Sequence, residues 1–140
     1  MQHLLEKAIS IALAEHKGQK DKGGNPYILH PLRVMLSVET IEEKIVALLH
    51  DVIEDSNITI QNLIEEHFPE EILKAIILLT KKQNQSYEDY ILAIKKNSLA
   101  NKVKLADLKD NMDKKRLLNI TEKDKARLKK YRYAYKMLNS

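Results

Sequence analysis

Residues 41–55 read IEEKIVALLHDVIED, and this stretch decides the fold class. Its apolar residues recur at spacings of three and four, which predicts an amphipathic α-helix. On a helical wheel that places His50 at 0°, the apolar side chains fill one arc from about 160° to 320°. The opposite side, from about 0° to 140°, holds Ala47, His50, Asp51, Glu54 and Asp55. One face of the predicted helix therefore packs, and the other gathers an imidazole and three carboxylates, with small Ala47 leaving room for a ligand.

Helical periodicity continues along the rest of the chain and predicts an all-α fold. All three glycines lie within GQKDKGGNPY, residues 18–27, which is therefore a loop. Thr59, Ser86 and Thr121 are placed to cap the helices that follow them, and Pro31 suits the first turn of another. The helices are expected at about 2–17, 30–38, 41–55, 59–67, 69–80, 86–96, 98–112 and 121–138.

The composition fits one globular domain and excludes several classes of site. A length of 140 residues, 44% of them hydrophobic and 31% charged, indicates a single domain over residues 1–140, a bundle of about eight helices. The absence of cysteine excludes disulfides, thiolate metal sites and cysteine nucleophiles. No apolar run approaches the roughly 18–20 residues that span a bilayer, and the N-terminus carries Glu6 rather than a secretory pattern. We therefore expect a soluble cytoplasmic protein without a membrane partner.

Three segments carry side chains that can bind a divalent metal. They contain His30, the pair His50-Asp51, and Asp107. Two imidazoles and two carboxylates from three helices suit Mn, Fe, Co, Ni or Zn, and they leave coordination positions open for water and substrate. Singly, each segment has a plainer interpretation. His30 would cap or pack a helix, and His50-Asp51 would lie on a solvated polar face. Asp107 would form a surface pair with a lysine. Together they favour a catalytic metal site.

Further polar residues lie near the predicted ligands. Glu54, one turn beyond His50, would act as a base or orient the attacking water, and Asp55 would support it. Lys104 and Asn111 share a helix face with Asp107, because they lie three residues before it and four residues after it.

The glycine-rich loop suggests a phosphorylated substrate. Lys17, Lys20 and Lys22 surround flexible backbone just before the first predicted ligand, where they would meet phosphate oxygens or only solubilise the loop. The P-loop spacing GxxxxGK[ST] is absent. Tyr27 either stacks on a base or packs the loop against the core, and packing is the commoner role. The candidate substrate contacts are Lys22, Tyr27, Lys104 and Asn111.

The segments HKGQKDKGGNPYILHP, ALLHDVIEDS and VKLADLKDNM resemble, in order and spacing, the HD-domain hydrolases of the RelA/SpoT-type group. The resemblance covers most of the chain and implies a helical bundle with its site in a central cleft. It implies hydrolysis of the 3′-pyrophosphate of the alarmone (p)ppGpp, which gives GDP or GTP and pyrophosphate. The expected partner is therefore a small phosphorylated nucleotide.

The same resemblance implies a role for each matching residue. The metal of that family is usually manganese, and the residues that match its ligands are His30, His50, Asp51 and Asp107. Glu54 and Asp55 match the pair that activates water. Asn111 matches an asparagine at the nucleotide site.

Three positions depart from the family pattern. The loop has Asp21-Lys22 where an Arg-Lys pair that contacts the nucleotide is usual, and an aspartate there weakens guanine stacking and repels phosphates. Leu108 replaces a basic residue, and Asp110 replaces a common histidine. Two alternatives therefore stay open: a phosphatase or pyrophosphatase for another nucleotide, and a non-catalytic module that binds a nucleotide or nucleic acid.

The last predicted helix, TEKDKARLKKYRYAYKML, interleaves basic residues with tyrosines, a pattern that can bind nucleic acid. Leu128, Tyr131, Tyr135 and Leu138 nevertheless lie at helical spacings that are typical of a packing stripe. We favour packing and expect no nucleic-acid partner. The net charge of +4 fits a phosphorylated substrate or solubility alone.

Overall fold

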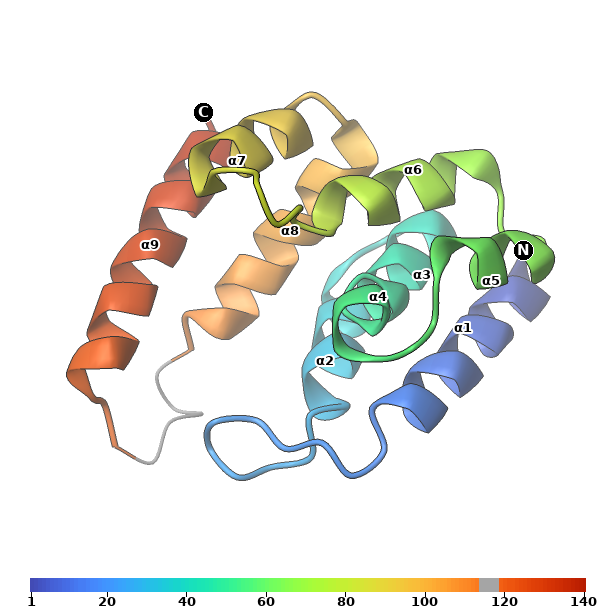
Figure 1. Cartoon of the computed structure of the whole chain (residues 1–140), viewed down its shortest axis with the longest axis horizontal. Coiled ribbons are helices and arrows are strands. Elements are labelled where there is room, and N and C mark those ends of the chain that lie inside the picture. Colours follow the sequence, from blue (N-terminus) through green and yellow to red (C-terminus); the bar gives the residue numbers. More distant parts are fainter. Residues whose placement is uncertain (114–118) are drawn as a thin grey trace.

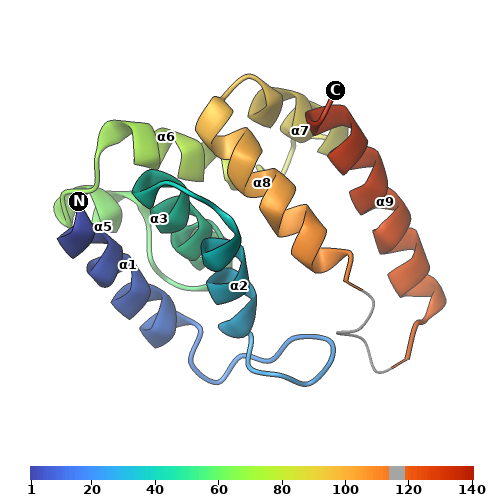
Figure 2. The ribbon, with the colours of Figure 1, turned by 180° about the vertical axis from the view of Figure 1, so that it is seen from behind.

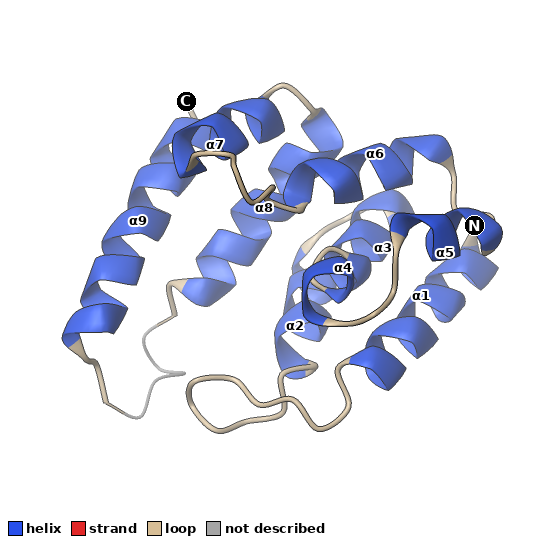
Figure 3. Cartoon of the chain, in the orientation of Figure 1, coloured by secondary structure: helices blue, strands red, loops and turns tan. Residues whose placement is uncertain are grey.

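The computed structural model describes residues 1–113 and 119–140, and these residues form helices joined by loops (Figure 3). The only β-type pairing among them is an isolated bridge between Lys20 and Pro26 in the glycine-rich loop. The helices are α1 (Gln2–Glu15), α2 (Leu29–Ser37), α3 (Ile41–Leu49), α4 (Val52–Asp55), α5 (Ile60–Glu65), α6 (Glu70–Leu79), α7 (Tyr87–Lys95), α8 (Ser98–Asn111) and α9 (Glu122–Leu138). The all-α prediction is confirmed.

Helices α3 and α8 organise the bundle. Helix α3 packs against α1, α2, α6 and α8, and residues 45–49 are completely buried. Helix α8 runs between the α2–α3 side of the molecule and α9, and both views show this arrangement (Figures 1 and 2). Burial of these apolar side chains removes them from water and supplies the main stabilisation of the fold.

The expected helix over 41–55 is interrupted at His50 and Asp51. Helix α3 ends at Leu49 and α4 begins at Val52, so the described part of the chain contains nine helices rather than about eight. The Nδ1 atom of His50 lies 2.8 Å from the carbonyl oxygen of Ala47, three residues back. A side chain that bonds a nearby carbonyl competes with the backbone ladder, and this explains the interruption.

The polar face of 41–55 is covered at Ala47 and His50, whereas Glu54 and Asp55 are exposed. His50 is 3% exposed and Ala47 is completely buried in the core. The expectation that Ala47 leaves room for a ligand is therefore wrong. A helical wheel places residues relative to one another, but the packing of α8 against α3 determines which of them meet solvent.

Local capping follows the sequence closely. The side chains of Thr40, Thr59 and Thr121 form reciprocal capping boxes, and Ser86 accepts a hydrogen bond from the backbone N–H of Asp89. On α9, Leu128 and Leu138 are buried, as the packing interpretation predicts. None of the described helices combines the length and the apolar character that crossing a bilayer requires.

Candidate metal centre and nucleotide pocket

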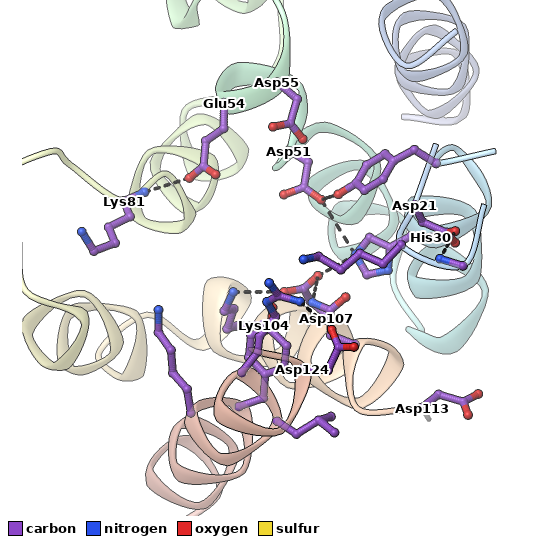
Figure 4. Close-up of a pocket in the computed structure, with 18 of the residues that line it drawn as sticks. Asp21, His30, Asp51, Glu54, Asp55, Lys81, Lys104, Asp107, Asp113 and Asp124 are labelled. Atoms are coloured by element: carbon purple, nitrogen blue, oxygen red, sulfur yellow. Dashed lines mark hydrogen bonds and ion pairs between the residues drawn. The ribbon is translucent and has the colours of Figure 1, made fainter. Parts of the chain in front are cut away.

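The structure brings the four predicted metal ligands together. His30 comes from α2, His50 and Asp51 from the break between α3 and α4, and Asp107 from α8. One donor atom from each lies within 4.8 Å of the others. The Nε2 atom of His30 is 2.8 Å from Oδ1 of Asp107 (Figure 4). The Nε2 atom of His50 is 3.3 Å from Oδ2 of Asp51.

The chemistry of this donor set fits a divalent cation. Two imidazole nitrogens and two carboxylates are the ligands that Mn²⁺, Fe²⁺ and Zn²⁺ accept. His30, His50 and Asp107 are buried, whereas the side chain of Asp51 is 18% exposed, so the centre opens on the Asp51 side.

Without a cation, the two carboxylates hold protons on the two imidazoles. Burial acts to lower the pKa of His50, but the charge of Asp51 and the hydrogen bond and charge of Asp107 outweigh it and raise the pKa to about 9. For His30, burial likewise opposes the hydrogen bonds to Asp107 and Asp110, and the net pKa is raised. Both imidazoles must lose a proton from Nε2 before that atom can bind a metal.

This electrostatic arrangement predicts that the metal-free protein is less stable at alkaline pH. A raised folded-state pKa stabilises the fold fully below the ordinary value of 6.5 and ceases to do so as the pH rises through about 9. We expect the melting temperature in EDTA to fall by several degrees over that interval. Differential scanning fluorimetry across a pH series measures it. A His50→Gln variant should show a shallower decline, and an equally steep decline in that variant would contradict the prediction.

Each ligand carboxylate is itself held by a neighbouring donor. The hydroxyl of Tyr27 donates to Oδ2 of Asp51 at 2.5 Å. Lys104 donates to Oδ2 of Asp107 at 3.0 Å, and the amide of Asn111 reaches Oδ1 of the same residue at 3.4 Å. Burial acts to raise the pKa of Asp107, but the charge of Lys104 and the histidine hydrogen bonds lower it well below its ordinary value.

These contacts revise the predicted substrate contacts. Tyr27, Lys104 and Asn111 all line the pocket, but each also bonds a ligand carboxylate. The side chain of Lys104 is only 11% exposed, and its ammonium lies 5.4 Å from the centre of the Tyr90 ring. Of the four predicted substrate contacts, only Lys22 is an exposed cation on the loop.

The bond from Tyr27 to Asp51 gives a direct test of this support. We expect Tyr27→Phe to weaken Mn²⁺ binding by about 10-fold, because a group that orients a ligand typically contributes 10–100-fold. The ring still packs, with its centre 4.9 Å from that of His16. Isothermal titration calorimetry measures the affinity. In the control Tyr133→Phe, which removes a hydroxyl from a half-exposed side chain on α9, Mn²⁺ affinity should stay within about twofold, since that side chain lies outside the pocket.

A pocket of about 610 Å³ is lined by three of the four predicted ligands, His30, Asp51 and Asp107. Its walls come from the glycine-rich loop, α4, α7, α8 and α9. The cations that line it are Lys20, Lys22, Lys81, Lys104, Arg127 and Lys130, and its aromatic residues are Tyr27, Tyr87, Tyr90 and Tyr131. Lys17, which sequence reasoning grouped with the other loop lysines, is exposed outside the pocket lining. The lining also carries the carboxylates of Asp21, Asp51, Glu54, Asp55, Asp107, Asp113 and Asp124. The cations and rings suit the phosphates and the base of a nucleotide, and the carboxylates suit a metal ion bound with it.

The predicted water-activating pair lies on the pocket wall. Desolvation there raises the pKa of Glu54 and, together with the charge of Asp51, that of Asp55. One carboxylate oxygen of Glu54 accepts a hydrogen bond from the backbone N–H of Lys81 at 3.0 Å (Figure 4). A carboxyl group with a raised pKa is a better general base near neutral pH than an ordinary one.

The departures from the family pattern have structural explanations. Asp21 accepts hydrogen bonds from the backbone N–H groups of Gly23 and Asn25, both at 2.9 Å, so its carboxylate closes the loop. Leu108 is completely buried in the core and does not face the pocket.

Sequence reasoning missed the contribution of α9. Arg127, Lys130 and Tyr131 line the pocket, although this helix was interpreted as packing and solubilising surface. The ammonium of Lys130 lies 4.1 Å from the centre of the Tyr87 ring on α7. The alternation of basic and aromatic residues is a signal for ligand contact, but only the packing of α9 shows that these residues line the same pocket as the predicted metal ligands.

The all-helical fold brings two histidines and two aspartates together, and the chain is similar in sequence to RelA/SpoT-type enzymes. Over 120 residues, 77% of the chain, it is 35% identical to a guanosine-3′,5′-bis(diphosphate) 3′-pyrophosphohydrolase of Aquifex aeolicus. Over 87% of the chain it is 37% identical to the GTP pyrophosphokinase rsh of Brucella melitensis. The resemblance to RelA/SpoT-type hydrolases is confirmed.

The sequence relatives are much longer than this chain, whereas the structural neighbour is of similar length. The chain spans only 17% and 18% of the length of those two relatives. A solved structure, described as a metazoan ortholog of SpoT that hydrolyzes ppGpp, superposes with a TM-score of 0.78 over 96% of this chain and 84% of that one, at 20% identity. That likeness establishes the fold. No family model matches the chain.

Proposed function

We propose that this chain is a metal-dependent hydrolase that removes the 3′-pyrophosphate of (p)ppGpp. The observation that carries the proposal is the convergence of His30, His50, Asp51 and Asp107 beside a pocket that holds both basic and acidic side chains. The name of the relative in Aquifex supports the choice of nucleotide. Mn²⁺ is the proposed ion, since imidazole and carboxylate donors suit it.

The residues around the pocket have distinct proposed tasks. A divalent cation held by the four ligands would polarise the phosphoryl group and lower the pKa of a bound water. Glu54 accepts the proton of the attacking water, and the negative charge of Asp55 beside it supports Glu54 as a base. Lys20 and Lys22 from the loop and Arg127 from α9 bind the substrate phosphates. Addition of water to the 3′-pyrophosphate ester yields GDP or GTP and pyrophosphate.

A second candidate is a phosphohydrolase for another nucleotide. It is favoured by Asp21, which lines the pocket and places a carboxylate where a guanine-stacking arginine is usual in the resembling family. In this case the metal centre and Glu54 keep the same tasks, and only the base and sugar contacts differ.

One assay separates these candidates. The purified protein is incubated with Mn²⁺ and either ppGpp or a panel of other nucleotides, beside Asp51→Ala and Glu54→Ala. Turnover of ppGpp that is lost in both variants supports the first proposal. Turnover of other nucleotides alone selects the second, whereas metal-independent binding without turnover would identify a non-catalytic module.

A further inference from the structure

A carboxylate lies directly behind one of the proposed metal ligands. Oδ2 of Asp110 is 2.6 Å from Nδ1 of His30, on the side of the ring opposite to the metal centre. Arg33 holds the same carboxylate through two hydrogen bonds, from Nε to Oδ1 at 2.9 Å and from Nη2 to Oδ2 at 3.3 Å. The side chain of Asp110 is 14% exposed and that of His30 is 2% exposed.

The geometry restricts which nitrogen of the imidazole can bind a metal. A carboxylate only accepts hydrogen bonds, so the short contact to Asp110 requires a proton on Nδ1 of His30. The lone pair that a metal needs must then be on Nε2, which is the atom that faces Asp107 at 2.8 Å. The hydrogen bond also fixes the rotation of the ring about its Cβ–Cγ bond.

We propose that Asp110, held by Arg33, is a positioning residue that fixes the tautomer and orientation of His30 for metal binding. The inference rests on the proposed metal centre and goes beyond it, since Asp110 and Arg33 are outside the four ligands. Groups that hold the second nitrogen of a ligand histidine typically contribute 10–100-fold to metal affinity.

The other proposed ligand histidine provides an internal comparison. Nδ1 of His50 lies 2.8 Å from the main-chain carbonyl oxygen of Ala47, an acceptor that likewise requires a proton on Nδ1. Both imidazoles therefore present Nε2 to the same point, one held by the main chain and one by the side chain of Asp110. The two acceptors differ, but both impose the tautomer whose Nε2 lone pair is available to a metal.

The alternative role of Asp110 is a purely structural ion pair that joins α2 to α8. A matched control exists in Lys7 and Glu66, whose side chains pair at 2.9 Å far from the four ligands. Glu66→Gln removes this ion pair between α1 and the end of α5, and it changes no group that contacts His30 or His50.

The test measures Mn²⁺ affinity by isothermal titration calorimetry in Asp110→Ala, Asp110→Asn, Arg33→Met and Glu66→Gln. We expect a 10–100-fold loss for Asp110→Ala, a smaller loss for Asp110→Asn and Arg33→Met, and no change for Glu66→Gln. Long-range ¹H–¹⁵N NMR of the Zn²⁺-loaded protein should show a protected Nδ1–H on His30 in the wild type that disappears in Asp110→Ala. Excess Mn²⁺ should restore turnover in that variant.

The outcomes separate this inference from the proposed function. Wild-type Mn²⁺ affinity in a folded Asp110→Ala or Asp110→Asn protein overturns the positioning role, even if ppGpp is hydrolysed. A loss of affinity together with an absence of ppGpp turnover in the wild type supports the positioning role and overturns the proposed substrate. If Asp110→Ala does not fold, the near-isosteric Asp110→Asn decides the matter. A wild-type protein that binds no Mn²⁺ overturns both.

Discussion

Replacing Asp107 with alanine is expected to abolish metal binding and to destabilise the fold at the same time. The carboxylate is buried and accepts hydrogen bonds from His30, Lys104 and Asn111, besides lying 3.4 Å from Nε2 of His50. Its loss leaves the ammonium of Lys104 buried without its charge partner. Breaking a buried ion pair from one side costs about 3–5 kcal/mol. Urea denaturation measures the free energy of unfolding, and calorimetry should show Mn²⁺ affinity reduced by more than about 100-fold, beyond the effect of an orienting group.

The double variant Asp107→Ala, Lys104→Met separates the two effects. Removing both charges should recover much of the lost stability, since an apolar pair of similar volume is often tolerated in place of a buried ion pair. Metal affinity should stay lost, because the ligand is still absent. A single variant Asp107→Ala that binds Mn²⁺ as tightly as the wild type would show that Asp107 is no ligand.

Replacing Glu54 with glutamine is expected to reduce turnover by about 10²–10⁴-fold while metal affinity and stability change little. Glu54 is outside the four converging ligands, and an amide oxygen can still accept the hydrogen bond from the backbone of Lys81. What glutamine cannot do is take a proton from water. Steady-state kinetics beside calorimetric Mn²⁺ titration gives both quantities.

The pH dependence of turnover provides the control for this variant. Because the pKa of Glu54 is raised, the wild-type rate should fall as the pH drops through that raised value and the carboxylate becomes protonated. Asp55→Asn should keep more activity than Glu54→Gln if Asp55 only supports the base. An unchanged kcat in Glu54→Gln would move the role of base to Asp55.

Local signals in the sequence were sufficient for most of the fold. The caps at Thr59, Ser86 and Thr121, the glycine-rich loop and the three-and-four periodicity located the helices to within a few residues. The break at His50 was not predictable, because it depends on an imidazole that bonds the Ala47 carbonyl, and a helical wheel represents no such bond. The covering of Ala47 by packed helices was equally invisible to periodicity.

The candidate site was also predicted only in part from the sequence. The residue types that suit a divalent metal were recognisable, and the fold brings His30, His50, Asp51 and Asp107 together. The neighbours of these residues were assigned less well. Tyr27 lies 24 positions from Asp51 along the chain, and the wall formed by α9 depends on its packing against α7 and α8. Contacts over such separations arise from tertiary packing, which single-sequence patterns do not contain.

The two histidines of the metal centre differ in how open they are to evolutionary change. A main-chain carbonyl holds His50, and no substitution of a side chain deletes a main-chain carbonyl. His30 depends on residue 110, a position that can mutate while all four donor residues stay in place. Under the proposed metal centre, substitution at this one position offers a lineage, or a protein engineer, a means to adjust metal affinity without changing any of the four donor residues.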